Sequence, residues 1–313
     1  MTQRRSRAAV VGSGRRIVLG VSGQQTTHLI DWATMLVRPG DTVRIVHGYR
    51  PIPYAAVDWQ LPVDNDSLVR GATERHVRAA AARLRRYRPD IVVVDELIGN
   101  PAGTALAMAA RDADLVLVGV PHGDRSRTVL ARLLAEVDCP VVVIGAAEPA
   151  VTGPVLSVLQ GNSLDEAVLQ AGFAAAHRRR RDLLVFKPWQ PPSNGRARYA
   201  ETAERQILDN RLIGWRERYP DVEVAAELRF GEPLQVLAEH TGAADLLVIG
   251  LRSDRAFLDA LLTNVIPARA RPTLLIPEKV LIPERAPIPE RAPAEPELDP
   301  QRLVSSGRTP ADG

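Results

Sequence analysis

The sequence predicts an α/β fold built from two tandem, doubly wound domains, each with a five-stranded parallel sheet. Three observations support this prediction. The chain has 313 residues, which suits two domains of ordinary size. Short apolar runs alternate with longer segments of helical composition, as in strand–helix–strand units. The two halves of the chain also repeat each other at a nearly constant offset.

The apolar runs predict ten strands in chain order. Several runs are apolar at every position, which is typical of parallel strands that helices cover on both faces. The segments between them, such as 67–88 and 198–218, are long enough for crossover helices. The predicted strands are 17–21, 43–47, 91–94, 115–119 and 141–144 in the first half and 155–159, 183–186, 222–226, 246–250 and 273–276 in the second.

An internal repeat relates the two halves. LIGNPAGTALAMAARDADLVLVG (97–119) parallels LRFGEPLQVLAEHTGAADLLVIG (228–250), with offsets of 131–132 residues. In the shared Gly-x-Pro, the glycine permits a turn and the proline suits the first turn of a helix, where an N–H has no partner. Asn100 is placed to cap the helix of the first copy, and Ser163 with Glu166 forms a capping box in the second half. The repeat therefore indicates duplication of one α/β unit.

The duplication sets the expected boundaries. Residues 1–14 form a basic, disordered arm, 15–148 the first domain, 152–277 the second domain and 278–313 a disordered tail. The tail contains the hexapeptide repeat IPEKVL-IPERAP-IPERAP, whose prolines exclude helix and sheet and favour extended polyproline II. Two interpretations of the tail stay open: a solvated segment, or a docking peptide for a protein partner.

Composition and charge exclude several classes of function. The chain carries a formal charge of +3, with +5 in residues 1–16 and −2 in residues 277–313, so residues 17–276 are neutral. A neutral body with 4% aromatic residues lacks the basic face that nucleic acid requires, so we expect no nucleic-acid partner. No apolar run is long enough to cross a membrane, and no secretory signal is recognised, so we expect a cytoplasmic protein.

Metal and thiol chemistry are also disfavoured. The single cysteine, Cys139, excludes an internal disulfide and a multi-cysteine metal centre, and a buried structural role is expected for it. The six histidines show no metal-ligand spacing, so we predict no metal site. Of these histidines, His122 is the one of interest, because it lies in the loop after the predicted fourth strand.

A set of motifs carries a family resemblance. RRIVLGVSGQQTTHLIDWA (15–33) has the form of an opening strand, loop and helix, and TVRIVHGYRP (42–51) that of a second strand. GNPAGTAL and GEPLQVL start helices, ADLVLVG and ADLLVIG are fourth strands, and CPVVVIG and RPTLLIP are closing strands. In this combination the chain resembles the universal stress protein family in its tandem two-domain form. The resemblance implies a five-stranded parallel sheet of the Rossmann-like, adenine-nucleotide-hydrolase-like kind in each half. It also implies pairing of halves or chains through the last strand, as an intramolecular pseudo-dimer or a homo-oligomer.

The resemblance also implies where a nucleotide would bind, because one branch of the family binds ATP and another does not. ATP-binding members place an Asp after the first strand, and here Ser22 and Gln160 stand at those positions, each followed by a glycine. They also carry Gly-x-x-Gly, nine residues, then Gly-Ser or Gly-Thr after the fourth strand. Counting back from the last strand puts Arg127-Thr128 and Asp259-Ala260 at the Gly-Ser positions, with a shortened loop. Counting forward from Gly250 and Ser253 instead reaches Thr263-Asn264, which leaves too few residues for the last helix.

These positions define the candidate residues. A loop with glycines at a helix start can bind an anion through backbone N–H groups, and the arginines and hydroxyls of HGDRSRT add to it. An aspartate at position 259 would repel phosphate. The candidate nucleotide or anion site of the first domain comprises Ser22, Gly23, Gly119, His122, Gly123, Arg125, Ser126, Arg127 and Thr128, and the degenerate site of the second comprises Gln160, Gly161, Gly250, Ser253 and Asp259.

We therefore expect a non-catalytic protein of the stress response that acts through binding, with a largely lost ATP motif. The alternative is a nucleotide-sensing module that binds ATP through the first-domain loop after strand four. A slow ATP hydrolase is a third reading, but beyond Asp124 the sequence places no general base or magnesium carboxylate near that loop.

Overall fold

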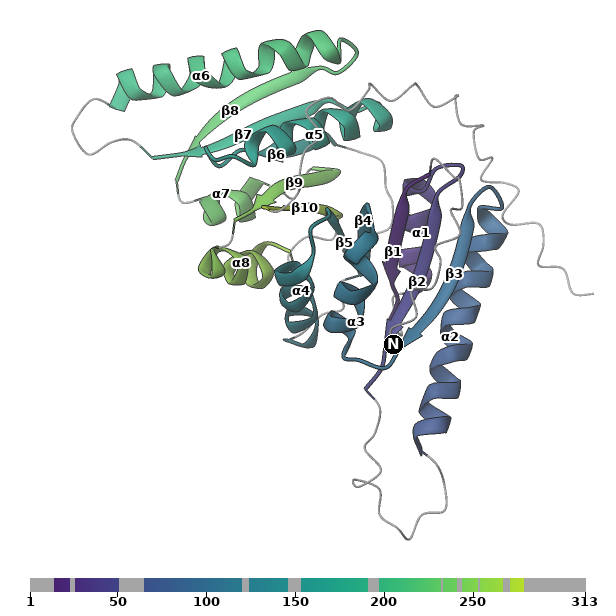
Figure 1. Ribbon diagram of the computed structural model, residues 1–313. Coiled ribbons are helices and arrows are strands. Elements are labelled where there is room, and N and C mark those ends of the chain that lie inside the picture. The colour runs from purple at the N-terminus through teal and green to yellow at the C-terminus, as the bar shows by residue number, and fades with distance from the viewer. Residues whose placement is uncertain are drawn as a thin grey trace, which may run out of the picture.

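The computed structural model describes residues 14–22, 26–50, 65–119, 124–145, 153–190, 197–231, 233–240, 244–252, 254–266 and 271–278 (Figure 1). The basic arm and the proline-rich tail lie outside these ranges except for Gly14 and Glu278. Gly23, His122, Gly123 and Ser253 also lie outside them. Within the described residues, no helix is long and apolar enough to cross a membrane.

The first half is a doubly wound unit with strand order β3-β2-β1-β4-β5, all parallel. Its elements alternate between strand and helix, as the apolar runs predicted. In chain order they are β1 (Arg16–Gly20), α1 (Thr26–Leu36), β2 (Thr42–Gly48), α2 (Asn65–Tyr87), β3 (Val92–Ile98), α3 (Ala102–Ala109), the 3-10 turn η3 (Ala110–Asp112), β4 (Leu115–Gly119), α4 (Asp124–Glu136) and β5 (Val141–Ile144).

The second half repeats this arrangement with strand order β10-β9-β6-β7-β8, again all parallel. Its last helix differs from the first copy because a short α-helix continues into a π-helical turn. Its elements are β6 (Val155–Val158), α5 (Asp165–Arg179), β7 (Leu183–Trp189), α6 (Ala197–Arg218), β8 (Val224–Phe230), α7 (Pro233–His240), β9 (Leu246–Leu251), α8 (Arg255–Ala260), η4 (Leu261–Val265) and β10 (Thr273–Pro277).

The two halves join into one ten-stranded sheet through their last strands. β5 and β10 pair antiparallel, with Val143 opposite Thr273, Val142 opposite Leu274 and Val141 opposite Leu275. The predicted fold class is confirmed, and the halves meet edge to edge. Because this pair is antiparallel, the carboxyl ends of the first-half strands point away from those of the second half.

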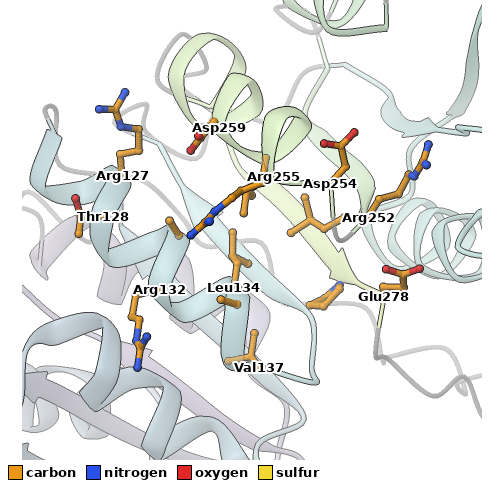
Figure 2. A pocket seen from close by; sticks show the side chains of 15 residues that line it. Arg127, Thr128, Arg132, Leu134, Val137, Arg252, Asp254, Arg255, Asp259 and Glu278 are labelled. Carbon is orange, nitrogen blue, oxygen red and sulfur yellow. The ribbon is translucent and has the colours of Figure 1, made fainter.

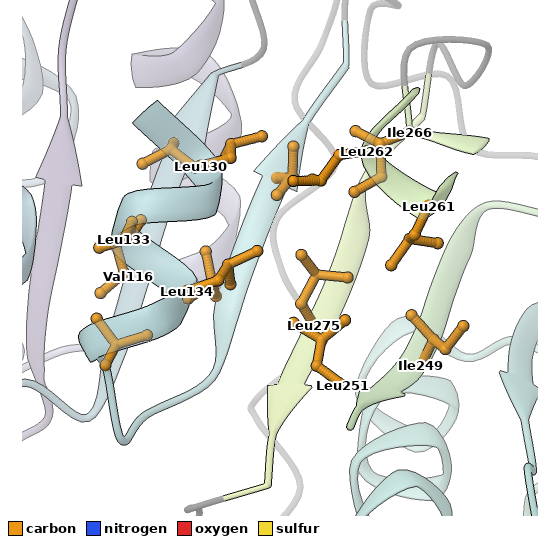
Figure 3. Close-up of a cluster of buried hydrophobic side chains, with 14 of the residues drawn as sticks. Val116, Leu130, Leu133, Leu134, Ile249, Leu251, Leu261, Leu262, Ile266 and Leu275 are labelled. Carbon is orange, nitrogen blue, oxygen red and sulfur yellow. The ribbon is translucent and has the colours of Figure 1, made fainter. Parts of the chain in front are cut away.

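Helices cover both faces of the joined sheet. On one face α3, α4, α7 and η4 pack into a single apolar cluster that includes strand residues of both halves. Leu275 of β10 is fully buried in this cluster, between leucines of α4 and η4 (Figure 3). On the other face, α1 and α2 pack over the first half, and α5 and α6 over the second. One core is therefore common to both halves, and two are separate.

Neither predicted helix cap forms. α5 begins at Asp165 with Leu164 at its N-cap, so the capping box of Ser163 and Glu166 is wrong. The loop is held instead by the Asp165 carboxylate, which accepts backbone N–H bonds from Gln160 and Gly161. α3 has Pro101 at its N-cap without a side-chain bond, and the Asn100 side chain turns toward Met108.

In the second half, α5 packs closely on β6 at a glycine. A Cβ atom added at Gly172 would lie 2.0 Å from the Ser157 hydroxyl oxygen. Ser157 is fully buried, and its hydroxyl has no hydrogen-bond partner among the described residues. The glycine therefore sets the distance at which α5 packs on the sheet.

Gly172→Ala is expected to lower the free energy of unfolding by about 2–3 kcal/mol, because the added methyl overpacks this contact. Ser157→Ala is expected to change stability by less than about 1 kcal/mol, since it removes an unpaired buried hydroxyl. In the double variant, part of the Gly172→Ala loss should be recovered. Urea unfolding of the four proteins measures this cycle, and strictly additive losses would contradict the proposed contact.

Candidate functional site

The sheet has two topological switch points, one in each half. In a doubly wound sheet, ligands bind in the crevice outside the carboxyl ends of the two strands at which the strand order reverses. These strands are β1 and β4 in the first half and β6 and β9 in the second. The predicted residues Ser22 and Gly119 lie at the first crevice, and Gln160, Gly161 and Gly250 at the second.

A side chain bridges the second crevice. Gln160 follows β6, and its Nε2 donates a hydrogen bond of 2.8 Å to the backbone carbonyl of Gly250 at the end of β9. Leu164 packs directly against Gly250, because a Cβ atom added at that glycine would lie 2.9 Å from the Cβ of Leu164. The place where a ligand would enter between the two strands is thus filled by the protein itself.

The loop that carries Gln160 is fixed by a buried carboxylate. The side chain of Asp165 is 2% exposed and accepts hydrogen bonds from the backbone N–H groups of Gln160 at 2.9 Å and Gly161 at 3.0 Å. Arg211 of α6 pairs with the same carboxylate at 2.7 Å. Gly161 has a φ of +72°, which a glycine adopts without strain. The sequence analysis missed Asp165 and Arg211 because their pairing joins two helices.

The first crevice has different walls. Ser22 is exposed, and its side chain is too short to span the crevice as Gln160 does. His47 of β2 lies with its Nδ1 2.7 Å from the carbonyl oxygen of Val21. Burial is the main cause that lowers the pKa of His47, so its imidazole is neutral at pH 7. Thr26 Oγ1 lies 2.8 Å from Nε2 of His76 on α2.

A groove also lies between the halves, with a volume of about 620 Å³ (Figure 2). α4 forms one wall, α8 and the end of β9 form the other, and the end of β10 closes one side. Its apolar lining comes from Ala131, Leu134, Ala135, Val137, Leu251, Leu258 and Pro277, and its charged lining from Arg127, Arg132, Arg252, Asp254, Arg255, Asp259 and Glu278.

The groove brings together candidate residues from both domains. Arg127, Thr128 and Asp259 all line it, although Arg127 and Asp259 are 132 residues apart. Arg127 Nη1 donates a hydrogen bond of 3.3 Å to Thr263 Oγ1, which in turn donates to the carbonyl oxygen of Asp259 at 2.6 Å. Arg125 and Ser126 lie in the first turn of α4. Positions related by the internal repeat thus lie close together where the halves join. The repeat was the sequence signal that could have indicated this proximity.

The sequence analysis missed three arginines of the groove. Arg132, on α4, pairs with Glu136 at 2.5 Å. Arg252 follows β9, and Arg255 reaches from α8 toward α4 (Figure 2). The carboxylate of Asp254 accepts the backbone N–H groups of Ala256 and Phe257 and so caps α8. No local motif marks these residues, because they become neighbours only when the two halves join.

Comparison with known proteins places this fold in a family. The model of the universal stress protein family matches residues 14–145. A universal stress protein of Mycolicibacterium smegmatis is 28% identical over 271 residues, which cover 80% of this chain and 91% of that protein. Residues 14–145 thus match the universal stress protein family, and the chain over most of its length is similar to a universal stress protein.

Solved structures agree with this assignment at the level of the fold. The crystal structure of a universal stress protein from Archaeoglobus fulgidus has a TM-score of 0.62 and 10% identity, over 84% of this chain and 96% of that one. The cytoplasmic domain of a prokaryotic cation chloride cotransporter has a TM-score of 0.52 and 9% identity, over 84% and 95% of the two chains. Since proteins with different descriptions share the architecture, these likenesses show the fold alone.

Cys139 is the one thiol in the chain, and the structure gives it an inert environment. It is 6% exposed in the apolar cluster common to both halves. Burial, with the charges of Asp114 and Asp138, raises its pKa to about 11. Because the thiolate is the reactive form, only roughly one chain in a thousand would carry it at pH 8.

We therefore predict that Cys139 in the native chain reacts with a thiol-specific disulfide reagent at pH 8 at least about 100-fold more slowly than in urea. The measurement is the absorbance of the released thiol against time with and without denaturant. Comparable rates in the two conditions would show that Cys139 is accessible and reactive in the folded protein.

Proposed function

We propose that this chain is a non-catalytic binding protein of the stress response, in which the second half has lost nucleotide binding. The observation that carries the proposal is the hydrogen bond from Gln160 to the Gly250 carbonyl across the second crevice. The side-chain amide of Gln160 lies between the ends of β6 and β9, where a nucleotide would have to contact both strands. The proposal extends the family assignment to the behaviour of each half.

Opening the second crevice would be costly. A ligand would have to break the Gln160–Gly250 bond and move Leu164 away from β9. The loop is also held by two backbone hydrogen bonds to the buried carboxylate of Asp165, which pairs with the partly exposed Arg211. Leaving a buried carboxylate without its hydrogen-bond donors carries a desolvation cost, so displacing this loop would reduce the affinity of a small ligand.

The polar groups at the sites support a binding role over catalysis. Asp254 is used as a helix cap, Thr263 donates to a backbone carbonyl, and neutral His47 is paired with the Val21 carbonyl. General acid–base catalysis needs a titratable group held within hydrogen-bond reach of a substrate atom. These described groups are committed to hydrogen bonds that hold the fold.

A second candidate function is nucleotide sensing by the first half. Two features favour it: Ser22 is too short to make the bridge that Gln160 makes in the second half, and Arg127 and Thr128 lie near the start of α4. Arginine and hydroxyl groups at the N-terminal end of a helix suit a phosphate. This function would use one nucleotide per chain, bound between β1 and β4.

Isothermal titration of the full chain with ATP, ADP and AMP tests both candidates. The proposal predicts at most one nucleotide per chain, because the second crevice is closed. Binding of two nucleotides per chain would overturn it. Absence of nucleotide binding would support the proposed binding protein without a nucleotide site and would reject nucleotide sensing by the first half.

Where one nucleotide binds, Arg127→Glu combined with Thr128→Ala decides whether the first-half loop is responsible. Nucleotide sensing through this loop predicts loss of binding in the double variant, with a decrease in affinity of at least about 100-fold from the reversed charge. Arg111→Glu, an exposed change in η3, is the charge-matched control and should leave affinity unchanged. Binding that survives the double change would show that the loop is not the site.

A further inference from the structure

The groove between α4 and α8 contains charged groups that the described fold leaves without partners. Arg252, Arg255 and Asp259 line the groove, and all three are exposed. None of their charged groups forms a hydrogen bond or ion pair with a described residue. Arg255 and Asp259 stand four residues apart on α8, so their Cβ atoms are about 5–6 Å apart. The α8 wall therefore presents a positive and a negative charge side by side, and Arg255 extends toward α4 (Figure 2).

The other polar groups of the groove are used within the fold. Asp254 caps α8, Arg132 pairs with Glu136, and Arg127 donates to Thr263. Between the charged groups, the lining is apolar. A simple anion would satisfy the arginines but would be repelled by Asp259. A ligand that fits this groove therefore brings apolar groups and charges of both signs.

The chain itself leaves the fold at one end of this groove. Pro277 and Glu278, the last described residues, both line it. In the antiparallel pair, Leu275 lies opposite Val141, which begins β5. Since α4 ends shortly before β5, the end of β10 lies at the end of the groove formed by Val137. The residues that follow Glu278 therefore start beside the groove.

The sequence that follows has the composition that the groove requires. Two identical copies of IPERAP occupy 282–287 and 288–293, and each has four apolar residues around an adjacent Glu and Arg. The groove lining on α4 runs from Arg127 to Val137, which is about 15 Å along a helix. Six residues in polyproline II span about 19 Å, so one copy covers the groove. Residues 279–281 lie between β10 and the first copy, where the chain can turn.

We propose that the first copy of the repeat, residues 282–287, docks in the groove between α4 and α8 of its own chain. Glu284 faces Arg255, and Arg285 faces Asp259, while the isoleucine, prolines and alanine cover the apolar lining. A short tether gives a docking segment an effective concentration of the order of millimolar, so modest contacts are enough to hold it. The proposal does not depend on either nucleotide crevice.

Limited digestion of the full chain with an arginine-specific protease tests the proposal. The two copies have the same sequence, so cleavage after Arg285 and after Arg291 should differ only if one copy is held. Docking predicts cleavage after Arg285 at least about 10-fold more slowly than after Arg291, because the protease acts on the undocked population. A synthetic peptide of residues 279–313 gives the intrinsic ratio of the two rates. The same ratio in the chain and in the peptide would overturn the proposal.

Charge reversal distinguishes docking from simple closeness to the folded body. Arg255→Glu should remove most of the protection at Arg285, because Glu284 would then face a like charge. Arg255 is exposed and unpaired, so the fold is expected to persist, and cleavage within the folded body should stay slow. Arg216→Glu, an exposed change at the end of α6, is the matched control and should keep the full protection.

A compensating change completes the test. Glu284→Lys alone should remove the protection, and Glu284→Lys combined with Arg255→Glu should restore it, since the pair is re-formed with its charges exchanged. Lysine adds no site for this protease. Protection that survives Arg255→Glu, or that fails to return in the double variant, would contradict the proposed pairing. Protection that rises with protein concentration would place the repeat of a second copy in the groove and would also contradict the proposal.

Discussion

The antiparallel pairing of β5 with β10 is the constraint on which the rest of the molecule depends. Each half alone would expose an edge strand whose residues are apolar on both faces, and exposed apolar edges favour association. Pairing covers both edges and places Leu275 at the centre of an apolar cluster supplied by both halves. The groove between α4 and α8 exists because this pair brings the halves together.

Duplication produced two halves with one topology and different strand ends. At equivalent positions after the first strand, Ser22 is short and exposed, whereas Gln160 spans its crevice to reach Gly250. The buried carboxylate of Asp165 then holds the loop that carries Gln160, through hydrogen bonds to its backbone. In the second copy, the ends of β6 and β9 are thus joined by a side-chain hydrogen bond. In the first half, Ser22 is too short to make the equivalent bridge between the ends of β1 and β4.

Much of the fold could be predicted from the sequence, because parallel strands buried on both faces leave continuous apolar runs. The observed β4 and β5 coincide with the runs at 115–119 and 141–144. Local patterns were less reliable at helix starts. The predicted capping box of Ser163 and Glu166 does not form, and the carboxylate of Asp165 instead accepts hydrogen bonds from the preceding loop. A pattern of four residues cannot show that an arginine from another helix, Arg211, will pair with the buried Asp165 and support the competing arrangement.

The candidate site was predictable only in part, for a related reason. The repeat identified Arg127 and Asp259 as equivalent, but their common groove follows from the way the halves join. The run RRRRD at 178–182 likewise gives no sign that the guanidinium carbon of Arg179 lies 6.0 Å from the ring centroid of Trp32 in the other half. Contacts of this kind depend on how the two halves join, which no local segment of the sequence shows.

Differential scanning calorimetry of the full chain tests the central claim, that the β5–β10 pair makes the two halves one structural unit. Because the halves share a buried core, the account predicts a single transition with a ratio of calorimetric to van't Hoff enthalpy of about one. Two resolved transitions, or a ratio near about two, would show that the halves unfold independently and would contradict the account.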